Sequence, residues 1–222
     1  MKKSSVLICT LTGQERDGWL HPKLGAFLTQ CALAAARGER QIQTLRLEGY
    51  RPHDFARNVG ANSFLEKSQL DWLCMLDNDS VPCDGLLKII DWAAPDADVV
   101  VPKFYCLTGN SKPDQVKLEL GWKLLPGTSI GSGWTEIEGA ASHCMFIRRR
   151  VFEKLAKPYF NFVYRDDGTV LEGEDLTFCA KARAAGFKIF GYEGAEVDHV
   201  KSFSLSLLAR IAGLAKPAQP GK

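Results

Sequence analysis

The first hundred residues alternate between short apolar runs and longer segments with helical spacing, and this alternation restricts the possible folds more than any other feature. The elements predicted in chain order are a strand at 5–11, a helix at 21–38, a strand at 41–49, a helix at 54–68, a strand at 71–77, a helix at 83–93 and a strand at 97–104. Strands that alternate with helices favour a parallel sheet covered by helices. We therefore expect an α/β fold with a mostly parallel central sheet.

The pattern changes in the second half of the chain. Residues 105–138 are rich in Gly, Pro, Trp and polar side chains, which predicts a long mobile loop that contains a small hairpin at 117–125. The segment 141–155 is predicted to be a strand that runs into a short helix. The segment 171–202 is predicted to be a helix that ends at Gly186, then a strand and a final extended piece that contains His199.

The composition is that of an ordinary globular protein. The chain has 222 residues, of which 45% are hydrophobic and 24% are charged, and this length suits one domain. We expect that domain at 1–202, followed by a C-terminal helix and flexible tail at 203–222. The formal net charge of +2 provides no strong attraction to nucleic acid or anionic membranes. No apolar run has the length of a membrane span, and seven cysteines without a C-x-x-C pair suggest reduced thiols in a cytoplasmic protein.

Two acids end a strand that is otherwise apolar. In "LCMLDNDS", only Asn separates Asp77 from Asp79. An Asp-Asn-Asp turn would be an ordinary structural explanation. In open α/β sheets, however, ligands bind beyond the carboxyl ends of the strands, where these acids are expected. Together with Glu174, Asp175 and His199 they suit a divalent ion such as Mn²⁺ or Mg²⁺, whose charge offsets their repulsion.

Four segments resemble motifs of one enzyme family. "LDNDS" resembles the D-x-D motif of nucleotide-sugar-dependent glycosyltransferases with the GT-A fold, which is Rossmann-like. "ARNVGANSFLEKS" resembles the R-N helix that precedes D-x-D in glycosyltransferase family 2. "GAASHCMFIRRRVFEKLAKPYF" is similar to their small-residue strand and the helix after it, and "LEGEDLTFCAKARAAGFKIFGYEGAEVDH" to their E-D-x-x-F-C helix with a distal His. The segments follow the family's order over nearly the whole chain, from Val6 to His199.

The resemblance implies a metal site and a donor site. Asp79 and His199 would bind Mn²⁺ or Mg²⁺ directly, and Asp77 directly or through water, with a possible contact to the donor ribose. The ion would bridge the donor diphosphate and stabilise the departing nucleoside diphosphate. The residues expected around the rest of the donor are Thr10, Leu11 and Thr12 at the nucleoside and Arg57 at the phosphates. A surface ion pair is the alternative for Arg57.

The resemblance also implies a catalytic pair. Asp175 would be the general base of an inverting transfer, and Glu174 would hold the sugar or orient the loop. Both could instead be acids that stabilise a helix N-terminus. The family often has an acid just past the second strand that reads uracil, and here only Glu48 or Asp54 comes close. A diphosphate donor is therefore more firmly implied than uridine as its base.

The function expected from these residues is metal-dependent transfer of a sugar from a nucleoside-diphosphate sugar, UDP-linked by expectation, to an acceptor hydroxyl. The acceptor could be a glycan, a metabolite or a modified DNA base. A nucleotidyltransferase is one alternative, although "TLTGQERDG" lacks the Gly-rich basic loop of those enzymes. A catalytically inactive sugar-binding module is another. Trp122 and Trp134 could stack on an acceptor or anchor the loop, and the arginines of 147–150 suit a strand-to-helix junction better than a nucleic-acid site.

Overall fold

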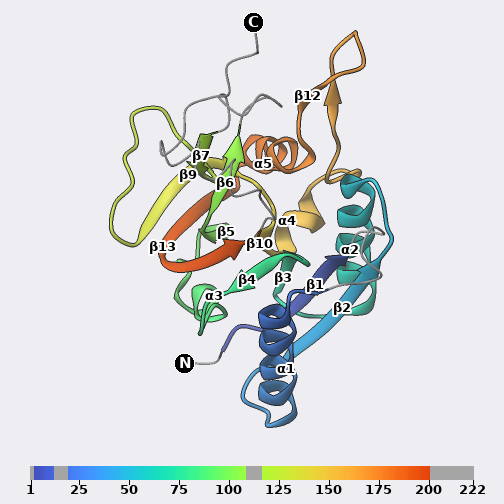
Figure 1. The fold of residues 1–222 in the computed structure, drawn as a ribbon, viewed down its shortest axis with the longest axis vertical. Helices are drawn as coiled ribbons and strands as arrows, with labels where there is room; N and C mark the ends of the chain where they lie inside the picture. Colours follow the sequence, from blue (N-terminus) through green and yellow to red (C-terminus); the bar gives the residue numbers. More distant parts are fainter. Residues whose placement is uncertain (1–2, 13–19, 109–116, 201–222) are drawn as a thin grey trace, which may run out of the picture.

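A single mixed sheet organises the chain in a computed structural model that describes residues 3–12, 20–108 and 117–200 (Figure 1). Its strands follow the order β2–β1–β3–β10–β5–β13–β9–β8, and β4 pairs with β13. Their bounds are β1 Val6–Thr12, β2 Ile42–Glu48, β3 Trp72–Asp77, β4 Ser80–Pro82, β5 Ala97–Lys103, β8 Trp122–Leu124, β9 Trp134–Ala140, β10 Cys144–Arg148 and β13 Lys188–His199. The two acids that end the apolar strand thus lie at the carboxyl end of β3, as expected.

Helices pack on both faces of this sheet. Their bounds are α1 Pro22–Ala36, α2 His53–Lys67, α3 Lys88–Trp92, α4 Arg149–Lys154 and α5 Glu174–Ala184. The predicted helices of the first half are confirmed, although α3 is shorter than expected. Gly38 and Gly186 follow α1 and α5 with φ of 68° and 89°, which a residue with a side chain adopts at a cost. Asp54 lies in the first turn of α2 and is not its cap.

The prediction of a mostly parallel sheet is only partly right. β1 pairs in parallel with β2 and β3, and β5 pairs in parallel with β13. However, β10 pairs antiparallel with both β3 and β5, and β9 pairs antiparallel with β13 and β8. All side chains of β10 from Cys144 to Ile147 are buried, so its sequence is a continuous apolar run. Such a run indicates burial on both faces but contains no information about strand direction.

The prediction that 105–138 is a long loop is wrong for its described part, and its mobility stays a prediction. Besides β8 and the start of β9, it contains β6 Tyr105–Thr108 and β7 Lys117–Leu120, which pair with each other. The expected hairpin at 117–125 is also wrong, because β7 pairs with β6 and β8 pairs with β9. Gly121 lies between β7 and β8, where a Cβ would come within 1.8 Å of the Phe104 ring. Residues 109–116 lie outside the described part.

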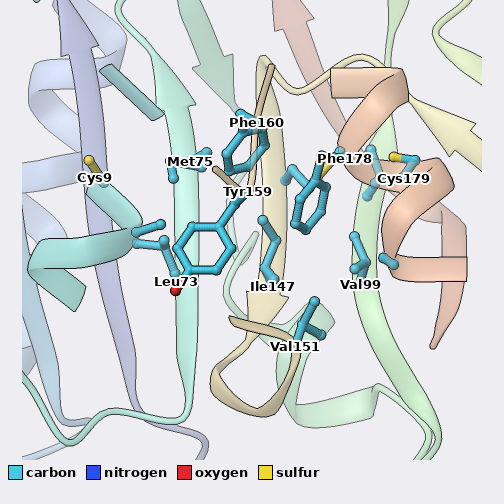
Figure 2. Packing of buried hydrophobic residues seen from close by; sticks show 14 of the residues in the cluster. Cys9, Leu73, Met75, Val99, Ile147, Val151, Tyr159, Phe160, Phe178 and Cys179 are labelled. Carbon is cyan, nitrogen blue, oxygen red and sulfur yellow. The ribbon is translucent and has the colours of Figure 1, made fainter. Parts of the chain in front are cut away.

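Two apolar cores hold the layers together. One joins the sheet to α2, α4 and α5 (Figure 2), and the other joins the opposite face to α1 and α3. In the first core, Phe178 of α5 stacks on Phe160 at 4.5 Å, and Phe152 of α4 packs against Phe178 at 6.0 Å. Removing such a buried aromatic side chain typically costs about 3–5 kcal/mol. These contacts fix the start of α5 relative to the strand ends.

The cysteines are free thiols, as expected. Burial raises the pKa of Cys9 and of Cys179 to about 12, which keeps both thiols protonated. Cys179 lies within the first core, and this agrees with a packing role. Among the described residues, no helix combines the length and apolar character that crossing a bilayer requires. The predicted helix and tail at 203–222 lie outside the described residues, and the domain division at 202 stays a prediction.

Candidate active site

The loop between β3 and β4, residues 77–80, is held by four separate segments, one of them at the start of α1, where the His21 N–H donates to the carbonyl of Asn78 at 3.0 Å. The Asp77 backbone N–H donates to the carbonyl of His143 at 2.9 Å, and the Asn78 N–H donates to the carbonyl of Leu11 at 3.1 Å. On the other side, the Val200 N–H donates to the carbonyl of Asp79 at 3.0 Å. The ends of β1 and β13, the start of α1 and the segment before β10 therefore determine where the two carboxylates lie.

Asp79 and His199 are in direct contact, and we call them the Asp79–His199 pair. His199 Nε2 lies 3.4 Å from Asp79 Oδ1, and their side chains are 17% and 21% exposed. The two residues meet because β13 runs antiparallel to β4, with His199 opposite Ser80. A carboxylate and an imidazole at this separation offer one oxygen and one nitrogen ligand, and both are reachable from solvent.

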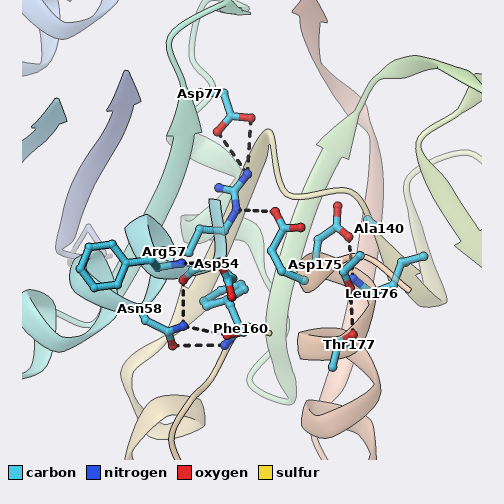
Figure 3. Close-up of polar contacts among 12 residues, drawn as sticks. Asp54, Arg57, Asn58, Asp77, Ala140, Phe160, Asp175, Leu176 and Thr177 are labelled. Atoms are coloured by element: carbon cyan, nitrogen blue, oxygen red, sulfur yellow. Dashed lines mark hydrogen bonds and ion pairs between the residues drawn. The ribbon is translucent and has the colours of Figure 1, made fainter. Parts of the chain in front are cut away.

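Asp77 faces a different partner. The Nη2 atom of Arg57, on α2, lies 3.2 Å from Asp77 Oδ1, and its Nε donates to Glu174 Oε1 at 3.3 Å. Figure 3 shows the guanidinium reaching from its helix toward Asp77. We call Arg57, Asp77 and Glu174 the Arg57 cluster. Only 3% of Arg57 is exposed, so the surface ion pair considered from the sequence is wrong. The ion pair itself is present but buried.

Charge and burial act in opposite directions within the Arg57 cluster. Burial alone would lower the pKa of Arg57, but Asp77, Glu174 and Asp175 raise it above its ordinary value. Burial raises the pKa of Asp77, although Arg57 opposes this effect. Arg57 Nη1 is buried without a hydrogen-bond partner in the described residues. The cluster therefore keeps one guanidinium N–H group that could donate a hydrogen bond to a bound anion.

Asp175 is the second residue of α5 and lies beside this cluster. Its Oδ1 accepts a hydrogen bond from the Leu176 N–H at 2.8 Å. Burial is the main cause that raises the pKa of Asp175, and the neighbouring Glu174 raises it further. The helix N-terminus favours the ionised form of Asp175, but desolvation outweighs the backbone hydrogen bonds. A raised pKa makes this carboxylate a better proton acceptor once it is ionised.

His143 is a site residue that the sequence reasoning missed. Its ring is 3% exposed and stacks on the His199 ring, with centroids 4.7 Å apart and planes at 16°. Burial lowers the pKa of His143 to about 3, and the neighbouring His199 lowers it as well. The signal in the sequence is a histidine directly before the apolar run of β10, within a segment that is predicted to be a strand.

The three residues expected around the nucleoside lie at the end of β1. The hydroxyls of Thr10 and Thr12 donate to the carbonyls of Leu45 and Leu47 in β2, at 3.5 and 3.1 Å, and Leu11 is buried. Their hydroxyls thus hold the sheet, and a donor role for them stays a prediction. The segment 13–19 after them lies outside the described residues.

The acids considered for base recognition lie at the surface. Glu48 pairs with Arg46 at 2.7 Å, and Asp54 accepts from the Phe55 N–H at 2.8 Å. Neither contact reaches the Arg57 cluster or the Asp79–His199 pair. Recognition of uracil by Glu48 or Asp54 stays a prediction.

The arginines and tryptophans discussed in the sequence analysis make structural contacts within the fold. Arg149 donates to the carbonyls of Phe64, Ser68 and Leu70, and Arg150 donates to Asp98 at 2.6 Å. These bonds fit the junction interpretation of 147–150. Trp122 is buried and donates its indole N–H to the Pro102 carbonyl at 3.0 Å, so it anchors the chain. Trp134 packs on Tyr192 with ring centroids 4.4 Å apart.

A divalent ion fits the residues present in part. Among residues 3–12, 20–108 and 117–200, no three His, Cys, Asp or Glu side chains converge closely enough to hold an ion alone. The Asp79–His199 pair places two side chains of ligand type together, and Asp77 is engaged by Arg57. Catalytic ions keep positions open for substrate, so phosphate oxygens and water can complete such a shell. The Asp79 and His199 side chains are therefore compatible with an ion that arrives together with a diphosphate.

Comparisons with known proteins give structural relatives only. No family model matches the chain, and no curated protein matches it. Among solved structures, A197 from STIV is 20% identical with a TM-score of 0.64, over 89% of this chain and 86% of that one. The structure of GalNAc-T7 with UDP, GalNAc and Mn²⁺ is 12% identical with a TM-score of 0.53, over 95% of this chain and 48% of that one.

A third match is the catalytic domain of Drosophila β1,4-galactosyltransferase 7 in complex with xylobiose, 13% identical with a TM-score of 0.49, over 98% of this chain and 82% of that one. GalNAc-T7, whose structure contains UDP, GalNAc and Mn²⁺, is thus a structural neighbour of this chain. The chain spans about half of the GalNAc-T7 chain. At these identities the first two likenesses concern the fold, and they agree with the GT-A-like architecture expected from the sequence. Membership of glycosyltransferase family 2 stays a prediction.

Proposed function

We propose that this chain is a metal-dependent glycosyltransferase that moves a sugar from a nucleoside-diphosphate donor, with UDP as the expected nucleotide, to an acceptor hydroxyl. The observation that carries the proposal is that the Asp79–His199 pair and the Arg57 cluster lie together at one edge of the sheet. The Asp79–His199 pair can hold an ion, and the Arg57 cluster connects Asp77 to the start of α5, where Asp175 lies. GalNAc-T7, which shares the fold, is known with UDP, GalNAc and Mn²⁺ bound, and this supports the donor class.

Asp79 and His199 are the residues that would hold Mn²⁺ or Mg²⁺ in this proposal. When bound, the ion supplies Lewis-acid stabilisation of the departing nucleoside diphosphate. Arg57 holds the carboxylate oxygens of Asp77 in place. These oxygens would accept a hydrogen bond from a hydroxyl of the nucleotide sugar or from a water molecule. The unpartnered Nη1 of Arg57 supports a contact with an anionic donor, because a buried guanidinium N–H without an acceptor is costly.

Asp175 is proposed to remove the proton from the acceptor hydroxyl. The acceptor oxygen attacks the anomeric carbon as the bond to the diphosphate breaks, and the hydroxyl proton moves to the Asp175 carboxylate. Attack from the face opposite the leaving group gives inversion. Burial and Glu174 raise the pKa of Asp175, which strengthens it as a base. Glu174 is itself held by Arg57, so the donor side and the base are kept at a set separation.

The test is a two-step screen of the full chain. Thermal unfolding is followed with a panel of nucleotide sugars and Mn²⁺, since a ligand that binds the folded state raises its stability. The nucleotide sugar that stabilises the protein most is then incubated with candidate glycan, metabolite and modified-DNA acceptors, and glycosylated product is detected by mass spectrometry. Asp79→Asn is the inactive variant, and Asp84→Asn, an exposed acid beyond β4, is its matched control.

The outcomes separate the three functions considered. Release of nucleoside diphosphate with a glycosylated product supports the transferase. Formation of a nucleotide sugar from a sugar phosphate and a nucleoside triphosphate would indicate a nucleotidyltransferase instead. A binding module would be indicated if a nucleotide sugar stabilises the protein but is neither transferred to any acceptor nor slowly hydrolysed. No stabilisation by any nucleotide sugar would contradict the proposal.

A further inference from the structure

The backbone of His143 joins the two sides of the 77–80 loop. Its carbonyl accepts one hydrogen bond from the Asp77 N–H at 2.9 Å and another from Ser80 Oγ at 3.1 Å. Asp79 lies between these two attachment points. Ser80 is also the residue of β4 that pairs with His199 in β13. One carbonyl group therefore holds the loop that carries Asp79 and the strand that lies opposite His199.

The side chain of His143 acts on His199 directly. The two imidazole rings are nearly parallel, with planes at 16° and centroids 4.7 Å apart. The His143 ring also packs against the Phe104 ring in a T-shaped arrangement, with centroids 4.0 Å apart and planes at 63°. His143 is thus wedged between a buried phenylalanine and the imidazole of the Asp79–His199 pair. Its buried position leaves it little freedom to move away.

The nitrogens of His143 do not explain why the ring is there. Neither Nδ1 nor Nε2 has a hydrogen-bond partner of ordinary geometry among the described residues. A buried polar atom without a hydrogen-bond partner destabilises the folded state. The ring also lies near the backbone of Val197, but its contacts of regular geometry are those that it makes with the rings of His199 and Phe104. The ring face is turned toward the residue proposed to bind the ion.

We propose that His143 is a positioning residue whose ring and carbonyl fix His199 and the 77–80 loop in the arrangement that binds the divalent ion. The inference rests on the proposed function, since it assigns a role toward the proposed ion. Rotation of an imidazole about its outer side-chain bond is broad and nearly two-fold, so an unsupported His199 would direct its nitrogen over a wide range. Stacking on His143 restricts that rotation. Residues that orient metal ligands typically contribute about 10- to 100-fold in metal affinity.

Three variants of the full chain separate the ring from its nitrogens. His143→Phe keeps an aromatic face and removes both nitrogens, His143→Gln keeps polarity without a ring, and His143→Leu keeps apolar volume without a ring. The affinity for Mn²⁺ is measured from the electron paramagnetic resonance signal of free Mn²⁺, with and without UDP. We expect His143→Phe to stay within about threefold of the wild type. His143→Gln and His143→Leu are expected to bind about 10- to 100-fold more weakly.

A second readout needs no metal. Isotope-labelled histidine allows the ring signals of His199 to be followed by NMR in the metal-free protein, where the phenyl ring of His143→Phe should retain the stacking shift. His143→Gln and His143→Leu should lose that shift and show averaged ring signals. Thermal unfolding identifies any variant that has lost its fold, and the remaining non-aromatic variant then provides the comparison.

The outcomes distinguish this inference from the proposed function. Unchanged Mn²⁺ affinity and unchanged His199 signals in a folded His143→Gln or His143→Leu would overturn the positioning role and leave the proposed function intact. A loss in His143→Phe as large as in His143→Leu would also overturn it, because the nitrogens would then be what matters. A wild-type chain that binds neither Mn²⁺ nor Mg²⁺ would overturn the metal dependence of the proposed function, and the positioning role with it.

Discussion

The Arg57 cluster and the Asp79–His199 pair lie side by side but are built differently. In the cluster, a buried guanidinium holds two carboxylates at 3.2 and 3.3 Å. In the pair, a carboxylate and an imidazole lie near solvent at 3.4 Å, and their geometry suits an ion more than a strong bond to each other. The difference indicates a division of work in which the buried cluster sets positions and the accessible pair meets the ligand.

The largest expected effect comes from breaking the Arg57 cluster. Arg57→Met leaves Asp77 and Glu174 partly or fully buried without their counter-charge, and breaking a buried ion pair typically costs about 3–5 kcal/mol. Urea-induced unfolding measures this change in the free energy of unfolding. Arg37→Met, at an exposed arginine that pairs with Glu39 at 3.7 Å, is the control and should change stability by less than about 1 kcal/mol. Equal effects of the two substitutions would contradict the structural role of the cluster.

The next effect concerns turnover alone. Asp175→Asn keeps the shape of the side chain and removes the base, so turnover should fall about 10²- to 10⁴-fold. The free energy of unfolding should not fall, because the ionised carboxylate is partly desolvated where it lies. Steady-state kinetics and urea unfolding measure the two quantities on one sample. Asp166→Asn, at an exposed position before β12 (Val170–Glu172), is the matched control. Retention of anomeric configuration in the product would remove the need for this base.

Substitutions in the Asp79–His199 pair should lower metal affinity and leave stability nearly unchanged, whereas breaking the Arg57 cluster should mainly lower stability. Asp79→Asn and His199→Asn are each expected to weaken Mn²⁺ binding in the presence of UDP by tenfold or more, since each removes one of the two proposed protein ligands. Thermal stability should stay close to that of the wild type, because both side chains lie near solvent. Calorimetric titration provides the affinity. Asp84→Asn should leave it unchanged, and an unchanged affinity in His199→Asn would exclude that residue from the site.

The smallest effect is a dependence on pH. The pKa of Asp175 is raised, so the acidic limb of the rate profile should lie above the ordinary aspartate value of about 3.9, with activity rising as the pH rises. For stability the sign is opposite. A carboxyl group with a raised folded-state pKa stabilises the fold below its unfolded-state pKa, and this contribution is lost as the pH rises through the folded-state value. Asp175→Asn should remove that component, which unfolding measured across this pH range detects.

The first half of the fold could be predicted well because its signals are local. The strand that ends in Asp77 reads as an uninterrupted apolar run, and the helix between Pro22 and Gly38 has its start and stop residues within the same window. The described part of 105–138 could not be predicted in this way. β6, β7 and β8 are three or four residues long, and an alternation so short does not stand out beside the glycines around it.

The sequence by itself determined which residues are candidates and roughly where along the elements they lie: Asp77 at a strand end, Asp175 at a helix start and His199 near the end of the described chain. Only the tertiary structure decided their partners. Arg57 reaches Glu174 across 117 positions, and His143 meets His199 because β10 begins and β13 ends at this edge of the sheet. Periodicity and capping act within one or two turns, whereas these contacts arise when distant segments pack into a common core. That packing buries Arg57 between two carboxylates while it leaves Asp79 and His199 near solvent.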